Sequence, residues 1–172
     1  VMIRLLTGST HTGKTLLAQR LLERHGAPYL SIDHLKMGLI RSGMCPLTPE
    51  STDEALTAVL WPVVREIVKT AVENGQSLTV EGCYIPFNWR EDFDASCLPH
   101  IRFLCLVFSE AYIRTRFDTI QTHANAIERR KDDSFCTMEL LLAENRRNLE
   151  ACRRRGLPYY LIDGPYAPPL DW

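Results

Sequence analysis

The chain has 172 residues, 45% of them hydrophobic and 24% charged, and its 20 basic and 21 acidic side chains give a formal net charge of -1. That length builds one substantial core, so we expect a single domain over residues 1–172. The balanced charge supplies no overall positive field to hold a nucleic acid or an anionic membrane, which leaves a small molecule as the expected partner. Nothing in the composition decides the oligomeric state.

The six cysteines lack a CxxC pair, so their spacing does not indicate a metal site. Reduced cysteines within apolar runs act as small apolar side chains, and we therefore expect a reducing compartment. The apolar runs fall short of the roughly 18 residues that a membrane-spanning helix needs, and the N-terminus has no signal-peptide pattern. The expected location is the cytoplasm.

Five short apolar runs alternate with helix-like sequence along the chain. This alternation predicts a parallel sheet with helices on both faces, because strands covered on both sides are apolar throughout. The strongest helical pattern begins at a Ser51 cap and ends at Asn74-Gly75, and a second runs from about 134 to 155 and stops at Gly156. The sequence thus predicts a three-layer α/β fold with strands at 2–7, 28–32, 77–80, 101–108 and 159–162.

The first apolar run is followed by GSTHTGKT, which matches the pattern GxxxxGK[ST] between a strand and a helix. Glycines in such a loop let backbone N–H groups turn inward around phosphate oxygens, and the helix N-terminus adds a favourable dipole. Lys14 supplies positive charge and Thr15 a hydroxyl for Mg²⁺. The alternative is a strand-to-helix turn with incidental glycines. We predict an ATP site formed by Gly8, Ser9, Thr10, His11, Thr12, Gly13, Lys14 and Thr15.

Asp33 follows the second run and would lie at the ligand edge of the sheet, where its carboxylate can position an acceptor hydroxyl and take its proton. The same position suits a helix cap, and both interpretations stay open. Lys36 and Arg41 follow on the next helix and are candidates to bind an anionic acceptor. A solvated helix face is the alternative for these two residues.

Glu81 ends the third run, at the place where a Walker B acid holds Mg²⁺ directly or through water. The alternative is an acid that simply leaves the sheet for solvent. Arg90 follows in a segment that also contains Tyr84, Phe87 and Trp89, and it is a further candidate for binding the substrate. Aromatic residues in such a cluster more often belong to the core.

A helix carrying Arg114 follows the fourth run and leads to a highly charged stretch around Arg129 and Arg130, where we predict a small lid over residues 120–137. Arginines suit phosphoryl transfer because the planar guanidinium stabilises charge spread over phosphate oxygens. We assign Arg114 and Arg129 to ATP and Arg130 to catalysis. A solvated surface loop is the alternative.

These motifs together resemble the P-loop kinases of small molecules, a superfamily that includes nucleoside monophosphate kinases, shikimate and gluconate kinases and zeta-toxin-like kinases. The resemblance covers the whole chain. It implies the three-layer P-loop NTPase fold, an acceptor-binding segment at about 34–74, and contact of Arg130 with phosphates in the closed state. Thr15 directly after Lys14 and Glu81 in place of an aspartate depart from the adenylate kinase pattern, and the segment from Leu35 looks closer to zeta-toxin-like and 2-phosphoglycerate-kinase-like members.

The predicted function is an ATP-dependent phosphotransferase that uses Mg²⁺ and moves the γ-phosphoryl group to a small hydroxyl- or phosphate-bearing acceptor, with Lys14, Asp33 and Arg130 as catalytic residues. Two alternatives are a nucleoside monophosphate kinase proper and a regulatory module that binds nucleotide without turnover. A switch GTPase is disfavoured because the sequence has neither an Asn-Lys-x-Asp motif nor a DxxG motif.

Overall fold

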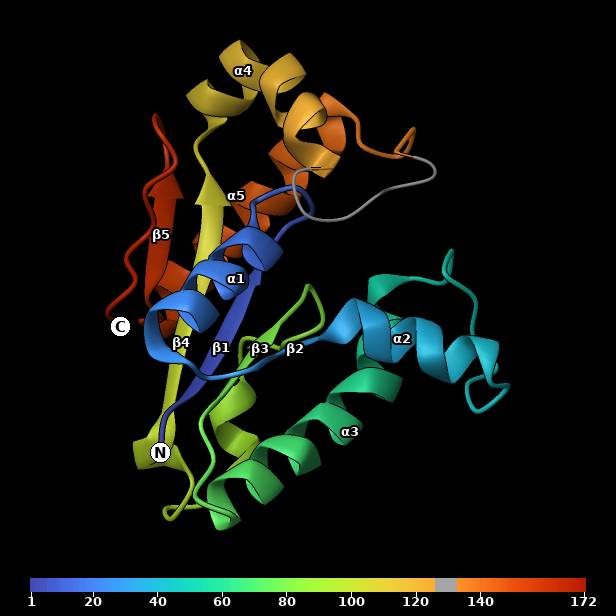
Figure 1. Cartoon of the computed structure of the whole chain (residues 1–172). Helices are drawn as coiled ribbons and strands as arrows, with labels where there is room; N and C mark the ends of the chain where they lie inside the picture. The colour runs from blue at the N-terminus through green and yellow to red at the C-terminus, as the bar shows by residue number, and fades with distance from the viewer. Residues whose placement is uncertain (126–132) are drawn as a thin grey trace.

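The computed structural model describes residues 1–125 and 133–172. In this part of the chain, five parallel strands form one sheet in the order β2-β3-β1-β4-β5 (Figure 1). Each strand begins within one residue of its predicted start. The strands are β1 (Ile3–Gly8), β2 (Tyr29–Ser31), β3 (Leu78–Glu81), β4 (Ile101–Phe108) and β5 (Tyr159–Ile162).

Helices cover both faces of this sheet, which confirms the predicted three-layer α/β architecture (Figure 1). The apolar sides of α1 (Lys14–His25) and α4 (Glu110–Thr122) belong to one core cluster, and the apolar side of α3 (Asp53–Glu73) belongs to the other. The long helix α5 (Met138–Arg155) contributes to both clusters. A shorter helix, α2 (Ile32–Arg41), follows β2 directly at the sheet edge.

The two core clusters result from the alternation of side chains along the central strands. In β4, Phe103 and Cys105 pack in the cluster that contains α3, whereas Leu104 and Leu106 pack in the cluster that contains α1. Because a strand points successive side chains to opposite faces, an unbroken apolar run is what this two-sided burial requires. The core therefore sits on both sides of β1 and β4 and fixes the carboxyl ends of these strands.

Two helix starts differ from the sequence prediction. The cap of α3 is Thr52 and not Ser51, because the Thr52 hydroxyl accepts a hydrogen bond from the Ala55 N–H at 3.2 Å. Helix α5 begins only after Thr137, whose hydroxyl accepts from the Leu140 N–H at 3.1 Å. Its predicted end at Gly156 is confirmed. None of the described helices has the length and apolar content to cross a membrane.

Candidate active site

The loop between β1 and α1 lies at the carboxyl edge of the sheet, where open parallel sheets bind ligands. Two of its residues have to be glycine. A Cβ on Gly8 would lie 2.5 Å from the carbonyl oxygen of Leu106, and Gly13, at φ 79°, caps α1 in a left-handed conformation. Glycine adopts such backbone angles without steric cost. The positions of the two glycines in GxxxxGK[ST] thus follow from the close approach at Gly8 and the left-handed backbone at Gly13.

The side chain of Lys14 is held inside this loop. Its ammonium donates to the backbone carbonyl of Ser9 at 2.8 Å, and the Thr12 hydroxyl donates to the same carbonyl at 2.8 Å. Lys14 is only 8% exposed. A positive charge therefore lies at the N-terminus of α1, where the helix dipole also favours an anion.

Two residues from distant parts of the chain hold the loop in place. The sequence predicts a turn at Asp163–Tyr166 that touches the nucleotide base, but it indicates no role for Asn145. Asn145 of α5 donates to the Ser9 hydroxyl at 2.8 Å and accepts from the Phe108 N–H at 2.8 Å. The Tyr166 hydroxyl donates to the carbonyl of Gly13 at 2.7 Å. Burial raises the pKa of Tyr166 above its usual value, so this donor keeps its proton. No local sequence pattern indicates the role of Asn145, because that role depends on the packing of α5 against the end of β4.

Oxygen ligands suited to a divalent cation meet next to the loop. The Thr15 hydroxyl donates to a Glu81 carboxylate oxygen at 3.2 Å, and Glu81 is only 2% exposed. This excludes the alternative in which Glu81 simply leaves the sheet for solvent. A hydroxyl beside a buried carboxylate at the phosphate loop fits the hard, oxygen-liganded ion Mg²⁺. The two predicted metal ligands are therefore brought together.

The geometry beyond Glu81 depends on a close approach between β3 and α2. The Thr7 hydroxyl donates to the carbonyl of Gly82 at 2.9 Å, which fixes the chain as it leaves the strand. A Cβ on Gly82 would lie 2.8 Å from the Cβ of Ile32, the first residue of α2. The helix that carries Asp33 can approach the end of β3 only because residue 82 has no side chain.

Asp33 lies in the first turn of α2 and forms an ion pair with Lys36, whose ammonium is 2.7 Å from Asp33 Oδ1 and 3.0 Å from the Tyr84 hydroxyl. The residue at the N-cap position of α2 is Ser31, so Asp33 does not cap this helix. Burial lowers the pKa of Lys36, but Asp33 and Tyr84 outweigh this effect, and the net pKa is raised. Burial also raises the pKa of Tyr84 to about 12.

Further carboxylates face the same region. Burial raises the pKa of the half-buried Cys83 thiol; the Lys14 charge opposes this rise, and the charges of Asp33, Glu144 and Asp53 add to it. Neither Glu144, on α5, nor Asp53, at the start of α3, was among the predicted site residues. The charges of described residues that act on Cys83 are therefore mainly negative.

Three predicted arginines are exposed or have partners outside the groups described above. Arg90 lies over the ring of the buried Trp89, in a 3-10 helix (Trp89–Asp92) whose Asp92 accepts from Trp61 in the middle of α3. Arg41 is the exposed last residue of α2. Arg114 is exposed and donates to Glu110 of its own helix. Arg129 and Arg130 lie outside the described residues, as do the other positions of 126–132 within the predicted lid at 120–137.

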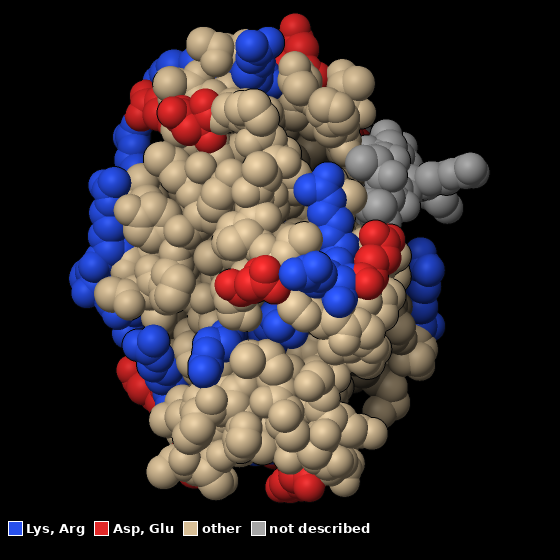
Figure 2. Space-filling model, turned by 60° about the vertical axis from the view of Figure 1, so that its left-hand side comes forward, with Lys and Arg blue, Asp and Glu red and all other residues tan. Residues whose placement is uncertain are grey.

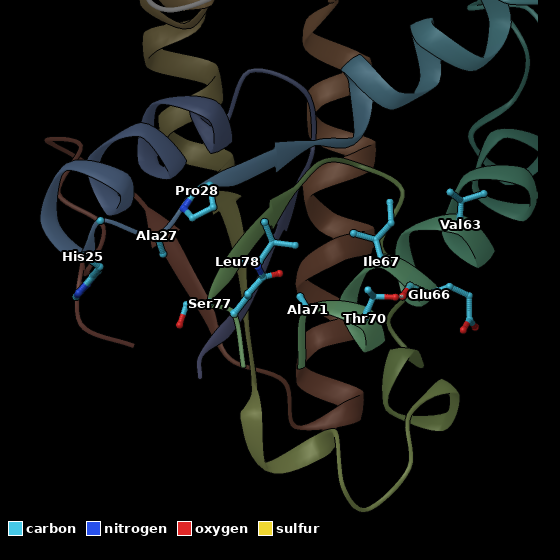
Figure 3. A pocket seen from close by; sticks show the side chains of 12 residues that line it. His25, Ala27, Pro28, Val63, Glu66, Ile67, Thr70, Ala71, Ser77 and Leu78 are labelled. Atoms are coloured by element: carbon cyan, nitrogen blue, oxygen red, sulfur yellow. Dashed lines mark hydrogen bonds between the residues drawn. The ribbon is translucent and has the colours of Figure 1, made fainter. Parts of the chain in front are cut away.

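A groove lies at the opposite edge of the sheet. This groove of about 780 Å³ is formed by the end of α1, the middle of α3 and the amino ends of β2 and β3 (Figure 3). Ligands of parallel sheets bind beyond the carboxyl ends of the strands, so the groove is separate from the candidate active site. It is lined by His25, Gly26, Ala27, Pro28, Val63, Glu66, Ile67, Thr70, Ala71, Gln76, Ser77 and Leu78.

The fold of this chain is similar to the folds of solved kinase structures. A gluconokinase from Sinorhizobium meliloti 1021 matches with a TM-score of 0.54 and 20% identity over 98% of this chain and 85% of its own. The chain has the fold of a P-loop small-molecule kinase. A putative kinase from Chloroflexus aurantiacus matches this kinase fold with a TM-score of 0.57 and 21% identity, over 94% of this chain and 87% of its own.

A shikimate kinase from Aquifex aeolicus matches as well, with a TM-score of 0.54 and 14% identity over 96% of this chain and 89% of its own. No protein-family model matches the sequence, and no curated protein matches it. At these identities the likeness establishes the kinase fold alone. It does not assign the substrates of these neighbours to this chain.

Proposed function

We propose that the protein is an ATP-dependent phosphotransferase of the cytoplasm that uses Mg²⁺ and phosphorylates a hydroxyl group of a small molecule. The observation that carries the proposal is the meeting of Lys14, the Thr15–Glu81 pair and the Asp33–Lys36 pair at one edge of the sheet. These groups supply what phosphoryl transfer needs, namely a held phosphate chain, a metal site and an oriented acceptor.

Each group has a role that follows from its position. The loop N–H groups and the Lys14 ammonium bind the β- and γ-phosphates. Thr15 and Glu81 would hold Mg²⁺, which when bound neutralises charge that develops on the phosphate oxygens. Asp33 accepts a hydrogen bond from the acceptor hydroxyl and takes its proton as the oxygen attacks phosphorus. The bond from phosphorus to the bridging oxygen of ADP then breaks.

A hydroxyl acceptor without a phosphate group is favoured by the charges around the site. The described carboxylates of Asp33, Asp53 and Glu144 repel an anion, and the Lys36 ammonium is already paired with Asp33. Arg41 is exposed at the end of α2, and Arg90 lies over the ring of Trp89. These observations support a neutral or cationic hydroxyl compound over a nucleoside monophosphate.

A small-molecule partner also agrees with the molecular surface. Most of the face shown in Figure 2 is formed by residues without charged side chains, and both signs of charge occur on it. Binding of nucleic acid depends on the neutralisation of many phosphates by lysine and arginine. The surface therefore supports the same class of partner that the net charge of the sequence indicates.

The decisive experiment measures ADP release with ATP, Mg²⁺ and a panel of sugars, polyols, amino alcohols and nucleoside monophosphates. We expect release that depends on a hydroxyl compound and not on a nucleoside monophosphate. Release with nucleoside monophosphates alone would establish the monophosphate kinase instead. ATP binding without release for any acceptor would support the regulatory module.

Lys14→Met should reduce acceptor-dependent ADP release by at least about 100-fold, because the loop loses the charge that stabilises the transferred group. Lys69→Met is the matched control, since Lys69 lies on the surface of α3 and pairs with Glu66. Circular dichroism checks that both variants fold. Full activity in Lys14→Met would contradict the assignment of the loop.

A further inference from the structure

The phosphate loop carries a group of possible metal ligands that the proposed function does not use. His11 Nε2, an oxygen of Asp133 and Cys136 Sγ all lie within 4.8 Å of one another. His11 belongs to the phosphate loop, and the other two residues lie just before α5. The group therefore joins two segments that are more than a hundred positions apart in the chain.

The imidazole of His11 is already oriented as a metal ligand would be. Its side chain is fully buried, Nδ1 lies 2.8 Å from the Thr10 hydroxyl, and Nε2 lies 2.7 Å from Asp133 Oδ2. In the metal-free protein the Nε2–H donates to Asp133 Oδ2. With the proton on Nδ1 instead, where it donates to Thr10, the imidazole would present the Nε2 lone pair to a metal ion. Metal-binding histidines are commonly fixed in this way by a hydrogen bond on their second nitrogen.

The spacing of the three groups fits a tetrahedral ion. Bond lengths of about 2.0 to 2.3 Å require ligand atoms about 3.3 to 3.6 Å apart. The His11–Asp133 pair at 2.7 Å thus needs to open by about half an ångström to admit the ion. The side chain of Asp133 is about a quarter exposed, so it has room to move.

We propose that His11, Asp133 and Cys136 form a site for Zn²⁺ or another borderline-soft divalent cation, distinct from the Mg²⁺ position at Thr15 and Glu81. A mixed set of one nitrogen, one oxygen and one sulfur ligand is typical of zinc, whereas magnesium takes oxygen ligands alone. Three protein ligands leave a fourth position for water. The ion would connect the phosphate loop to the start of α5.

The sequence spacing of the cysteines does not reveal such a site. A CxxC pattern detects ligands that are close together in the chain, and here the ligands come from two distant segments. The proposal is independent of the kinase activity, because it concerns metal binding to the folded protein alone.

Zn²⁺ binding to the full chain tests the proposal, measured by competition with a chromophoric chelator in excess Mg²⁺ and a phosphine reductant. The excess Mg²⁺ keeps Zn²⁺ away from the oxygen ligands at Thr15 and Glu81. We expect one bound equivalent and a loss of affinity of more than about tenfold in both Cys136→Ser and Asp133→Asn. Cys97→Ser is the control, since Cys97 is also a buried free cysteine, at the opposite edge of the sheet.

Co²⁺ supplies a second readout for the same three variants. A thiolate-to-cobalt charge-transfer absorption should appear in the unmodified protein and in Cys97→Ser and be absent from Cys136→Ser. Asp133→Asn keeps the size of the side chain, so the Zn²⁺ affinity of this variant tests the proposal even where Cys136→Ser fails to fold. Failure to bind Zn²⁺, or binding that survives the Asp133→Asn substitution, would overturn the proposal.

Discussion

The ammonium of Lys36 contacts two residues, Asp33 and Tyr84. It is 2.7 Å from Asp33 Oδ1, 3.0 Å from the Tyr84 hydroxyl and 5.2 Å from the centre of the Tyr84 ring, and its side chain is 13% exposed. A group engaged in this way is better placed to hold Asp33 than to bind an acceptor. We infer that Lys36, predicted from the sequence as a substrate ligand, is a positioning residue for Asp33.

Lys36→Met tests this role. We expect kcat to fall by about 10- to 100-fold because the Asp33 carboxylate loses its fixed orientation, while the acceptor KM changes little. Lys36→Arg should restore part of kcat. Steady-state kinetics with a hydroxyl acceptor measure both constants, and a rise in KM at constant kcat would show that Lys36 binds the acceptor instead.

Asn145 connects helix α5 to the phosphate loop. It is 2% exposed and bonds to Ser9, Leu141 and the N–H of Phe108. Asn145→Ala leaves buried polar groups without these bonds, so we expect the free energy of unfolding to fall by about 1–3 kcal/mol. ATP affinity should fall with it, because Ser9 is no longer held.

Chemical denaturation and ATP titration measure the two effects of Asn145→Ala. Asn148→Ala on the same helix is the matched control, as Asn148 is only half-buried. A loss of stability with unchanged ATP affinity would show that α5 supports the core but not the loop.

The strands and the phosphate loop could be predicted because their causes are local. A strand buried on both faces is apolar throughout, and the loop conformation demands glycine at fixed spacing. The positions of Thr15 and Glu81 follow from the same logic, since adjacent parallel strands end at one edge. These parts of the site needed no knowledge of distant contacts.

The remaining site residues depend on packing between segments that are far apart in sequence. Asn145 and Tyr166 reach the loop only because α5 and the segment after β5 lie beside it. The place of Arg90 after β3 predicts a substrate ligand, but the buried Trp89 and the Asp92–Trp61 bond hold its segment against α3. The packing of the buried Trp89 therefore decides where the segment of Arg90 lies, and its position after β3 does not.

The stability of the whole molecule should depend on the charge of Glu144. Burial and the Asp53 charge raise the pKa of Glu144 above its usual value, and the charges of Arg147 and Lys14 and the Thr10 backbone bond oppose this rise only in part. A carboxyl with a raised pKa binds its proton more tightly in the folded state, so stability falls as pH rises through that range. The ionised carboxylate thus costs stability at neutral pH.

Glu144→Gln should therefore raise the melting temperature at neutral pH and have no such effect in acid, below the usual carboxyl range. It should also tighten ATP binding, because a negative charge beside Lys14 is removed. Thermal denaturation across pH and ATP titration check the two effects. An equal gain in melting temperature at both pH values would point to packing rather than charge.

The contact between Gly82 and Ile32 also limits how the sequence can diverge in evolution. A methyl group at position 82 would lie 2.8 Å from the Ile32 Cβ, whereas one at Gly38, further along α2, would meet nothing within 4 Å. Space alone therefore allows Gly38 to be substituted during evolution. A larger residue at position 82 would move α2 and Asp33 away from the loop, so we expect selection against it. Position 82 therefore stays a fixed point beside Asp33 while the side chains around it are free to change.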